Sequence, residues 1–559
     1  MAAPTEVPRK VTVRLDTGLR QDVGRTSLLF TGVGAIIGSG WLFGALYAAQ
    51  IAGPAAILSW IIGGIMVMVI GVVYAELAVM FPVSGGIIRF PHYSFGSFAS
   101  YSSGWTSWLA AAAVTPIEVL ATTQYADPYI PWLMDSTNGV FVLTGPGLLV
   151  AIALMFVYSV VNVLGVKLLT RLNNVLVWWK LAVIALVVLA FLVLAFNPGN
   201  LGAVAGFAPS GFGAVFAAIP AAGVAFAYLG FRNGIEFAGE TDDPQRNVPF
   251  AVIGSILITG IIYVLLQIAF ITAVPAELLA GGWAQLTFAE GEVAGPLAGL
   301  SLVLGAVWLA VLLRVDAVIS PADTGLIYAG VTTRLSYANA RNGNAPQWLT
   351  RLNSRGVPWL SVLLMFVVGC LLFLPFPGWR QFIGFITSAF AISFGAGPLV
   401  VGALRRQLPD QERPFLVPGG DLLPYLAFLA SSLLVFWAGW AINEKMFLAL
   451  LVGYVVFAGY SFVARDRMPP FEFKAGSWFP IWVGGLAVIS YFGDVDPGGP
   501  ADPGLVLNGG NGPLNLLWGA LVIAVFSAVV YAYAIAVRLP PERAAANISQ
   551  LPTDAPAKL

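Results

Sequence analysis

The chain has almost no cysteine and almost no histidine. Its 559 residues include one cysteine, Cys370, and one histidine, His92. A lone cysteine cannot form an intrachain disulfide or a cysteine-rich zinc site, and a lone histidine cannot build a histidine-based metal centre. We therefore expect no metal and no other cofactor.

Charged residues are also scarce, at 10% of the chain, and the formal net charge is zero. Soluble domains average about 25% charged residues. Without a basic excess, a nucleic-acid partner is not expected. The sequence shows no nucleophile and base pair and no phosphate-cradling loop, so it does not predict an enzyme. Hydrophobic residues make up 58% of the chain instead, which predicts an all-α polytopic membrane protein whose main surroundings are the lipid bilayer.

About fourteen apolar runs are long enough to cross about 30 Å of hydrocarbon. They fall into a set of five, a second set of five and a final set of four. The predicted organisation has the following parts: a cytoplasmic N-terminal tail at 1–25, a first repeat of helices 1–5 at 26–198, a second repeat of helices 6–10 at 199–406, helices 11–12 at 407–468, two additional helices 13–14 at 469–538, and a cytoplasmic C-terminal tail at 539–559.

The Lys and Arg residues give an orientation. With the N-terminus in the cytoplasm, most of the 27 basic residues fall on the inside, and only Arg380 and Lys445 lie in outside loops. This distribution satisfies the positive-inside rule and predicts a plasma-membrane protein with both termini cytoplasmic. Lys180, Arg232 and Arg314 fall inside apolar runs, where charges are costly and point to function.

Two apolar segments at corresponding positions are interrupted by glycine. Residues 32–44 contain five glycines around Ser39, and residues 225–234 carry glycine and polar residues in mid-span. Close packing of helices through small residues is one interpretation of such spacing. The paired interruptions favour another, in which the first helix of each half is broken and the exposed backbone forms a site for an ionic ligand.

Several motifs resemble the amino acid-polyamine-organocation superfamily of permeases over about residues 25–465. They are GAIIGSG at 34–40, YAEL at 74–77, FPVSGG at 81–86, GE at 239–240 with PQRNVP at 244–249, and RLSYA at 334–338 with ARNG at 340–343. Within the superfamily, the chain is most similar to the aspartate-proton symporter branch, through GGIIRFP at 85–91, FAYLG at 226–230 and the fourteen-span layout.

The resemblance implies a LeuT-type 5+5 inverted repeat with broken helices 1 and 6, and with helices 3 and 8 lining the site. A half-helix beginning near Ser39 offers unpaired N–H groups to an α-carboxylate, and free carbonyls beside the breaks can accept from an α-ammonium. The expected substrate-binding residues are Ile36, Gly38, Ser39, Gly40, Phe226, Ala227, Leu229 and Arg232.

Proton coupling is expected at Lys180 and Glu118. In the family, a lysine at the place of Lys180 occupies the position of a sodium ion in sodium-coupled relatives, and a desolvated lysine can lose its proton. A lysine fixed to carbonyls of helix 1 without titrating is the alternative. Glu118, also in mid-span, either carries a coupled proton or pairs with an arginine.

Further charges are candidates for the pocket or a gate. Arg232 stands where many relatives carry glutamate, so a cation there suits an acidic substrate or a gate, and Arg314 and Asp316 are possible pocket or gate charges. The alternative for Arg232 is an internal pair with Glu236, four residues away. Glu76 is expected to hold the inner ends of helices rather than to touch substrate.

The sequence thus predicts a secondary active transporter that moves a small, acidic, aspartate-like amino acid together with protons by alternating access. An exchanger, a symporter for a neutral amino acid, and a ligand sensor built on a transporter fold are the alternatives. The sequence gives no indication of the oligomeric state.

Overall fold

The structure, a computed structural model, describes residue 9 and residues 23–137, 140–164, 166–202, 204–288, 295–463, 470–495 and 509–550, and leaves out the side chains of 136, 137, 140, 166–172, 381 and 550. The first half of the chain contains α1 (Arg25–Ile36), α2 (Gly40–Ala52), α3 (Ala56–Met80), α4 (Gly86–Ala126), β1 (Met134–Thr137), β2 (Val140–Leu143), α5 (Gly145–Leu164), α6 (Val166–Ala195), α7 (Gly213–Ala221), the 3-10 helix η3 (Phe226–Phe231), α8 (Arg232–Glu236) and α9 (Pro244–Ala273).

The second half is also helical. It contains α10 (Pro296–Val303), α11 (Val307–Arg341), α12 (Trp359–Leu372), α13 (Trp379–Gln407), α14 (Leu422–Trp437), α15 (Trp440–Val463), α16 (Phe473–Gly476), α17 (Trp478–Tyr491), α18 (Leu516–Val537) and α19 (Pro541–Gln550). Within the described residues, seven helices are long and apolar enough to cross a membrane singly, or eight if one bent pair counts as a span. The chain is a multi-pass membrane protein.

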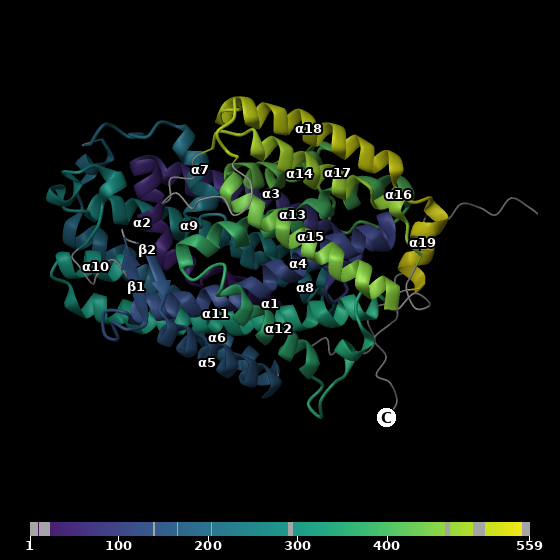
Figure 1. The fold of residues 1–559 in the computed structure, drawn as a ribbon, viewed down its shortest axis with the longest axis horizontal. Helices are drawn as coiled ribbons and strands as arrows, with labels where there is room; N and C mark the ends of the chain where they lie inside the picture. The colour runs from purple at the N-terminus through teal and green to yellow at the C-terminus, as the bar shows by residue number, and fades with distance from the viewer. Residues whose placement is uncertain are drawn as a thin grey trace, which may run out of the picture.

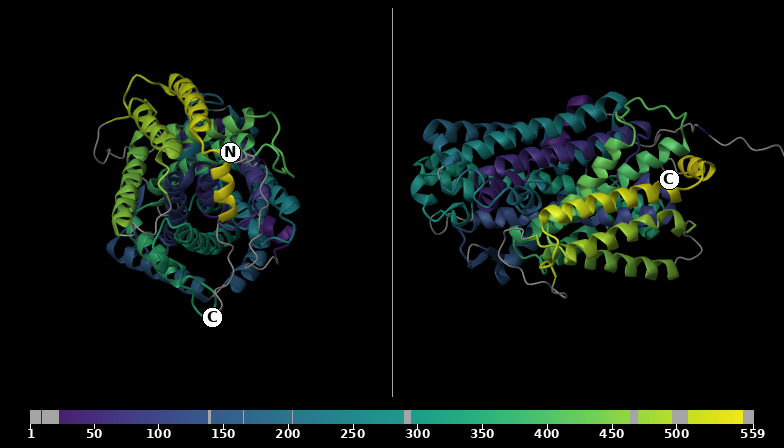
Figure 2. Two further views of the ribbon diagram at one scale, coloured as in Figure 1. Left: turned by 90° about the vertical axis from the view of Figure 1, so that its right-hand side faces the viewer. Right: turned by 90° about the horizontal axis from the view of Figure 1, so that it is seen from above.

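The long helices run roughly along one axis, with α18 at one edge and α5 at the opposite edge (Figure 1). The two further views also place the yellow C-terminal helices on the outside of the bundle (Figure 2). In the interior, α4 packs extensively against α11 and α13, and α1 packs against α9. Since α4 lies between helices of distant sequence, its polar side chains can face several elements at once.

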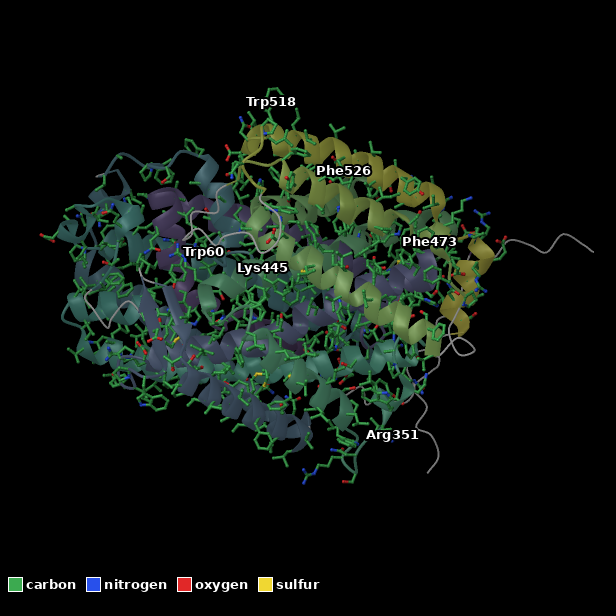
Figure 3. All side chains as sticks on the ribbon, viewed as in Figure 1. Trp60, Arg351, Lys445, Phe473, Trp518 and Phe526 are labelled. Carbon is green, nitrogen blue, oxygen red and sulfur yellow. The ribbon has the colours of Figure 1, made fainter. Side chains whose placement is uncertain are left out.

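The outer helices have one apolar face toward the protein and one toward the surroundings. On α18, Ile523 and Val530 are buried, whereas Leu517 and Trp518 are exposed. The labelled Trp518 side chain projects from the outer edge of the bundle (Figure 3). An exposed apolar face of this kind is stable against the hydrocarbon of a bilayer, because there it has no contact with water.

Both glycine-rich segments are interrupted. Helix α1 ends at Ile36 and α2 begins at Gly40, and the pair formed by α7 and residues 226–236 is bent by 55°. The two interruptions touch. A Cβ on Gly40 would meet Phe226 and Ala227 at 3.0–3.3 Å, and a Cβ on Gly230 would meet the backbone of Ala35 and Ile36. These glycines therefore serve close approach between the two broken helices.

Three features differ from the expected layout. The apolar run over 296–325 is divided, because the chain turns at Gly305, with φ of +73°, and α11 then continues to Arg341. Helix α4 is kinked at Gly96, with φ of +80°. Strands β1 and β2 pair antiparallel, which the apolar periodicity does not predict. Glycines at positive φ relax the backbone where a helix changes direction.

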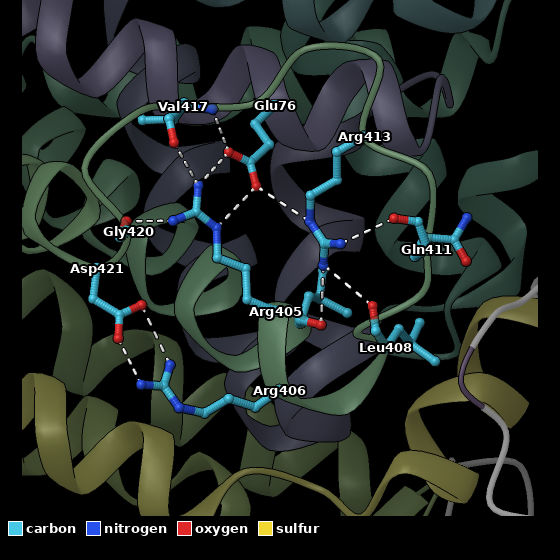
Figure 4. Close-up of polar contacts among 10 residues, drawn as sticks. Glu76, Arg405, Arg406, Leu408, Gln411, Arg413, Val417, Gly420 and Asp421 are labelled. Carbon is cyan, nitrogen blue, oxygen red and sulfur yellow. Dashed lines mark hydrogen bonds and ion pairs between the residues drawn. The ribbon is translucent and has the colours of Figure 1, made fainter.

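Glu76 ties the end of α3 to the end of α13. Its carboxylate accepts from Arg405 Nε at 3.2 Å and Nη2 at 2.6 Å and lies 3.5 Å from Arg413 Nε (Figure 4). The backbone N–H of Val417 also donates to Glu76, at 2.9 Å, and Arg405 donates to the carbonyl of Gly420. Glu76 thus holds helix ends, as expected from its place near the end of a span.

Replacing Gly230 by Ala tests the close approach of the two broken helices. The added methyl group collides with backbone rather than with a movable side chain, and overpacking of this kind costs about 1–3 kcal/mol. We expect a lower melting temperature for the purified protein in detergent. Gly459→Ala on α15 is the matched control, because a Cβ there meets no atom within 4 Å. Equal melting temperatures for the two variants would contradict this packing.

Candidate functional site

The interruption between α1 and α2 is held by side chains from several other helices. Residues 37–39 connect the two helices, and Ile37 and Ser39 have no exposed surface. Backbone N–H and C=O groups that leave a helix at membrane depth need partners within the protein. The residues that supply those partners define the site.

Lys180 of α6 binds the end of α1. Its ammonium donates to the carbonyl of Gly34 at 2.8 Å and to Thr324 Oγ1 at 3.2 Å, and it forms an ion pair with Asp323 Oδ2 at 2.7 Å. The Lys180 side chain has no exposed surface, and that of Asp323 is 4% exposed. This ammonium sits among a carbonyl, a hydroxyl and a carboxylate, which are the oxygen ligands that a bound cation would use.

Thr324 of α11 reinforces the same point. Its hydroxyl contacts the carbonyl of Gly34 at 3.0 Å and that of Ile37 at 3.3 Å. The carbonyls at the end of α1 are therefore satisfied from α6 and from α11 together.

Glu118 of α4 binds the start of α2. Its Oε2 accepts from the backbone N–H of Ser39 at 2.8 Å, and the residue has no exposed surface. The other oxygen, Oε1, has no hydrogen-bond partner among the described residues. A Cβ on Gly38 would lie 2.5 Å from Oε1, so glycine leaves room for the carboxylate to rest on the chain.

The carbonyl of Ile36 already has two donors. The N–H of Gly38 lies 3.0 Å from it, and the hydroxyl of Tyr263 on α9 lies 3.1 Å from it. The carbonyl of Leu229 accepts from the N–H of Arg232. The sequence predicts free carbonyls at both positions; here both carry protein donors, because the irregular backbone is satisfied internally. Phe226 and Ala227 contact Gly40, which brings these predicted substrate-binding residues to the same place.

Trp379, the first residue of α13, covers this region on one side. Its indole N–H donates to Ser39 Oγ at 2.8 Å, and its ring stacks on Phe43 with centroids 4.6 Å apart. Tyr47 continues the aromatic layer, and the guanidinium of Arg380 lies 4.7 Å from its ring centroid. The site is thus closed on this side by aromatic side chains of α2 and α13.

Arg232 is buried and bound internally. Its Nη2 donates to Ser107 Oγ at 2.9 Å and to Glu236 Oε1 at 3.0 Å, while Nε and Nη1 lack hydrogen-bond partners among the described residues. Ser107 and Glu118 are both on α4, about 16 Å apart along its axis at 1.5 Å per residue. The guanidinium therefore contacts α4 at Ser107, and the internal pair with Glu236 is present.

Arg314 and Asp316 contact different residues. Arg314 donates to Tyr129 Oη at 2.6 Å, in the turn after α4. Asp316 is buried and accepts from Trp179 Nε1 and Ser320 Oγ, both at 2.8 Å. Arg314 is therefore not among the residues that contact the break. Asp316 contacts Trp179, which precedes Lys180 in α6.

Sequence analysis missed four residues that bind the break: Asp323, Thr324, Tyr263 and Trp379. A signal existed for Asp323, since it is a carboxylate within an apolar run. A hydropathy profile shows residues 296–325 as one helix. Because the chain in fact turns at Gly305, the profile does not reveal that Asp323 lies opposite Lys180. The hydroxyl and indole donors give no comparable signal, because such residues are common in membrane helices.

One cation and two carboxylates therefore meet at the break. Lys180 and Asp323 form a neutral pair at the end of α1, and the second carboxylate, Glu118, binds the start of α2. Broken helices with charged groups at their ends are the architecture that membrane transporters use to bind small ionic substrates. The helical fold and this site define a membrane transport protein.

Comparison with known proteins identifies the family. Residues 23–492 match the family model for amino acid permeases, and the chain belongs to that family, within the amino acid-polyamine-organocation superfamily. It is an amino acid permease and not an enzyme.

Relatives of known activity cover nearly the whole chain. The glutamate/serine transporter AimA of Bacillus subtilis is 35% identical, with 92% of this chain and 94% of the relative aligned. The aspartate-proton symporter of the same organism is 33% identical, with 92% and 96% aligned. Its branched-chain amino acid permease BcaP is 27% identical, with 80% and 94% aligned.

A double-mutant cycle tests the ion pair at the end of α1. Lys180→Met and Asp323→Leu each leave one buried charge without its partner, and we expect each to cost about 3–5 kcal/mol. The double variant should lose less than the sum, because both charges are gone. Chemical or thermal unfolding of the purified protein measures the three losses. Additive losses would mean that Lys180 and Asp323 do not depend on each other.

Proposed function

We propose that this permease is a proton-coupled amino acid symporter of the plasma membrane that works by alternating access. The proposal includes a LeuT-type 5+5 inverted repeat, about fourteen transmembrane helices and cytoplasmic termini. The touching interruptions at residues 37–39 and 222–231 support the repeat, because they stand at the first helix of each proposed half.

The charge cluster at the α1/α2 break is the observation that carries proton coupling. Lys180 donates to Gly34 and pairs with Asp323 where a metal cation would need oxygen ligands, so an ammonium already supplies the positive charge. Glu118 is a second carboxylate without a cation in direct contact among the described residues. Burial in a low-dielectric environment disfavours the charged form of a carboxylate and so favours its binding of a proton.

The same region supports recognition of an amino acid backbone. The start of α2 at Gly38, Ser39 and Gly40 favours an α-carboxylate through its N–H groups and its dipole. The α-ammonium would bind the carbonyls of Ile36, Phe226 and Leu229, displacing protein donors such as the Tyr263 hydroxyl.

For the substrate, we propose a small acidic amino acid, glutamate or aspartate. Two relatives above 30% identity carry glutamate and aspartate in their names, which supports this choice. Serine is the second candidate, because the name of one of these relatives includes it. Exchange of amino acids without a proton gradient remains the alternative mode of transport.

For Arg232, we propose a role in a gate instead of contact with the substrate side chain. Its guanidinium is already bound to two side chains of the protein, Ser107 and Glu236. The buried bridge from α8 through Arg232 to Ser107 links the broken helix to α4, and its separation would open a path beside the break. Arg314, beside Tyr129, is a candidate for a gate on the other side.

Uptake into proteoliposomes tests the proposed function. Purified protein should accumulate labelled glutamate or aspartate when an inward proton gradient is applied without sodium. Accumulation of serine alone would retain the symporter and change the substrate. Exchange of preloaded substrate without accumulation would make the protein an exchanger, and binding without any transport would favour a sensor.

Replacing Arg232 by Gln separates a gate from a substrate contact. We expect uptake of acidic and neutral substrates to fall by a similar factor, because the bridge to Ser107 and Glu236 is lost for both. The measurement is the ratio of initial rates for glutamate and serine in the variant and in the wild type. A selective loss of glutamate would instead place Arg232 in the substrate site.

A further inference from the structure

We propose that the Glu118 carboxylate and the α-carboxylate of the substrate compete for the same N-terminus of α2, so that substrate binding transfers one proton onto Glu118. This inference rests on the proposed amino acid symport and assigns its proton carrier. It makes Glu118 an internal substitute for the substrate, and it gives Lys180 the separate role of a fixed counter-ion.

The contact itself places a carboxylate where a substrate carboxylate belongs. Helix α2 has 13 residues, and Glu118 Oε2 accepts from the N–H of Ser39, its N-cap residue, at 2.8 Å. The Ser39 side chain does not cap α2; its oxygen accepts from Trp379, and its hydroxyl interacts with the Glu118 carboxylate. The helix N-terminus therefore obtains its anion from α4, across the core of the protein.

The second oxygen of Glu118 also supports this exchange. Oε1 is buried, has no hydrogen-bond partner among the described side chains, and lies against Gly38. A purely structural cap would be expected to have both oxygens satisfied, because an unpaired buried acceptor costs about 1–3 kcal/mol. The half-satisfied carboxylate is suited to leave this position.

Two anions cannot share this position. A substrate carboxylate at Ser39 would lie within a few ångströms of Glu118, and like charges at about 3 Å in a buried site do not both stay ionised. Lys180 cannot neutralise the second anion, because it is already paired with Asp323 at 2.7 Å. Protonation of Glu118 removes the conflict: the carboxylate takes one proton, releases the N–H of Ser39, and the substrate anion replaces it.

The other groups around Glu118 do not supply this proton. The titratable side chains that interact with it are Lys180 of α6, Tyr158 of α5, Tyr263 of α9 and Tyr328 of α11, and Lys180 is in turn paired with Asp323. Tyrosine hydroxyls are neutral in the physiological range, and the Lys180 ammonium is held in its ion pair with Asp323. The proton therefore comes from solvent, and its uptake is linked to substrate binding.

The linkage has a measurable sign. Where Glu118 is ionised without substrate and protonated with it, the dissociation constant of the substrate rises about tenfold for each unit of pH. Glu118→Gln has no charge to lose, so its affinity should be independent of pH. At pH 8 the variant should bind more tightly than the wild type, whereas loss of a favourable contact would weaken binding.

The test uses full-length protein in detergent, titrated with L-glutamate, L-aspartate and L-serine between pH 5.5 and 8.5. We expect the sloped wild-type profile and a flat Glu118→Gln profile, with retained exchange and lost proton-driven accumulation in proteoliposomes. Glu277→Gln neutralises an exposed carboxylate of the 276–279 turn and is the matched control, which should keep the wild-type slope.

Two outcomes would overturn the inference while leaving amino acid transport intact: a flat wild-type profile, or a Glu118→Gln profile with the wild-type slope. If the variant does not fold, wild-type calorimetry at pH 8 in two buffers of different ionisation enthalpy decides. Uptake of close to one proton per substrate supports the inference, and no uptake overturns it. Absence of binding and transport for every amino acid would instead reject the proposed function.

Discussion

The structure depends on satisfying a helix that is interrupted inside the membrane. Backbone groups released at residues 37–39 have no water to bind at that depth, so every partner has to come from the protein. Lys180 and Thr324 bind the carbonyls at the end of α1, Tyr263 binds that of Ile36, and Glu118 binds the N–H of Ser39. Because these residues come from α4, α6, α9 and α11, the break fixes how four helices surround α1.

Charge follows from the same constraint. Each broken end attracts the opposite charge, so carbonyls at the end of α1 collect an ammonium and the start of α2 collects a carboxylate. An amino acid carries this same pair of charges. The protein therefore satisfies its own backbone with the functional groups of its substrate class, and in the proposed binding mode the substrate would exchange with these partners. In that binding mode, the same backbone groups would bind protein side chains when the site is empty and the substrate when it is filled.

Sequence reasoning located the break but not all of its partners. Glycines flanking Ser39 and Gly230 are costly in a helix, so their clustering is visible in one dimension. The contact between Lys180 and Asp323 depends on helix register, which the unpredicted turn at Gly305 sets. For Arg232 the four-residue spacing predicted the pair with Glu236, whereas its bond to Ser107 of α4 required the fold. Hydroxyl donors such as Tyr263 are too common in membrane helices to stand out.

The Glu76 network has a mechanical consequence. A single buried carboxylate joins the ends of α3 and α13, and through Val417 it also holds the loop that follows α13. Glu76 and Arg405 are more than three hundred residues apart in the chain, yet their contact holds the ends of the two helices together. In the proposed alternating access, any movement that separates the ends of α3 and α13 would have to break this ion pair, so we expect these two ends to move together.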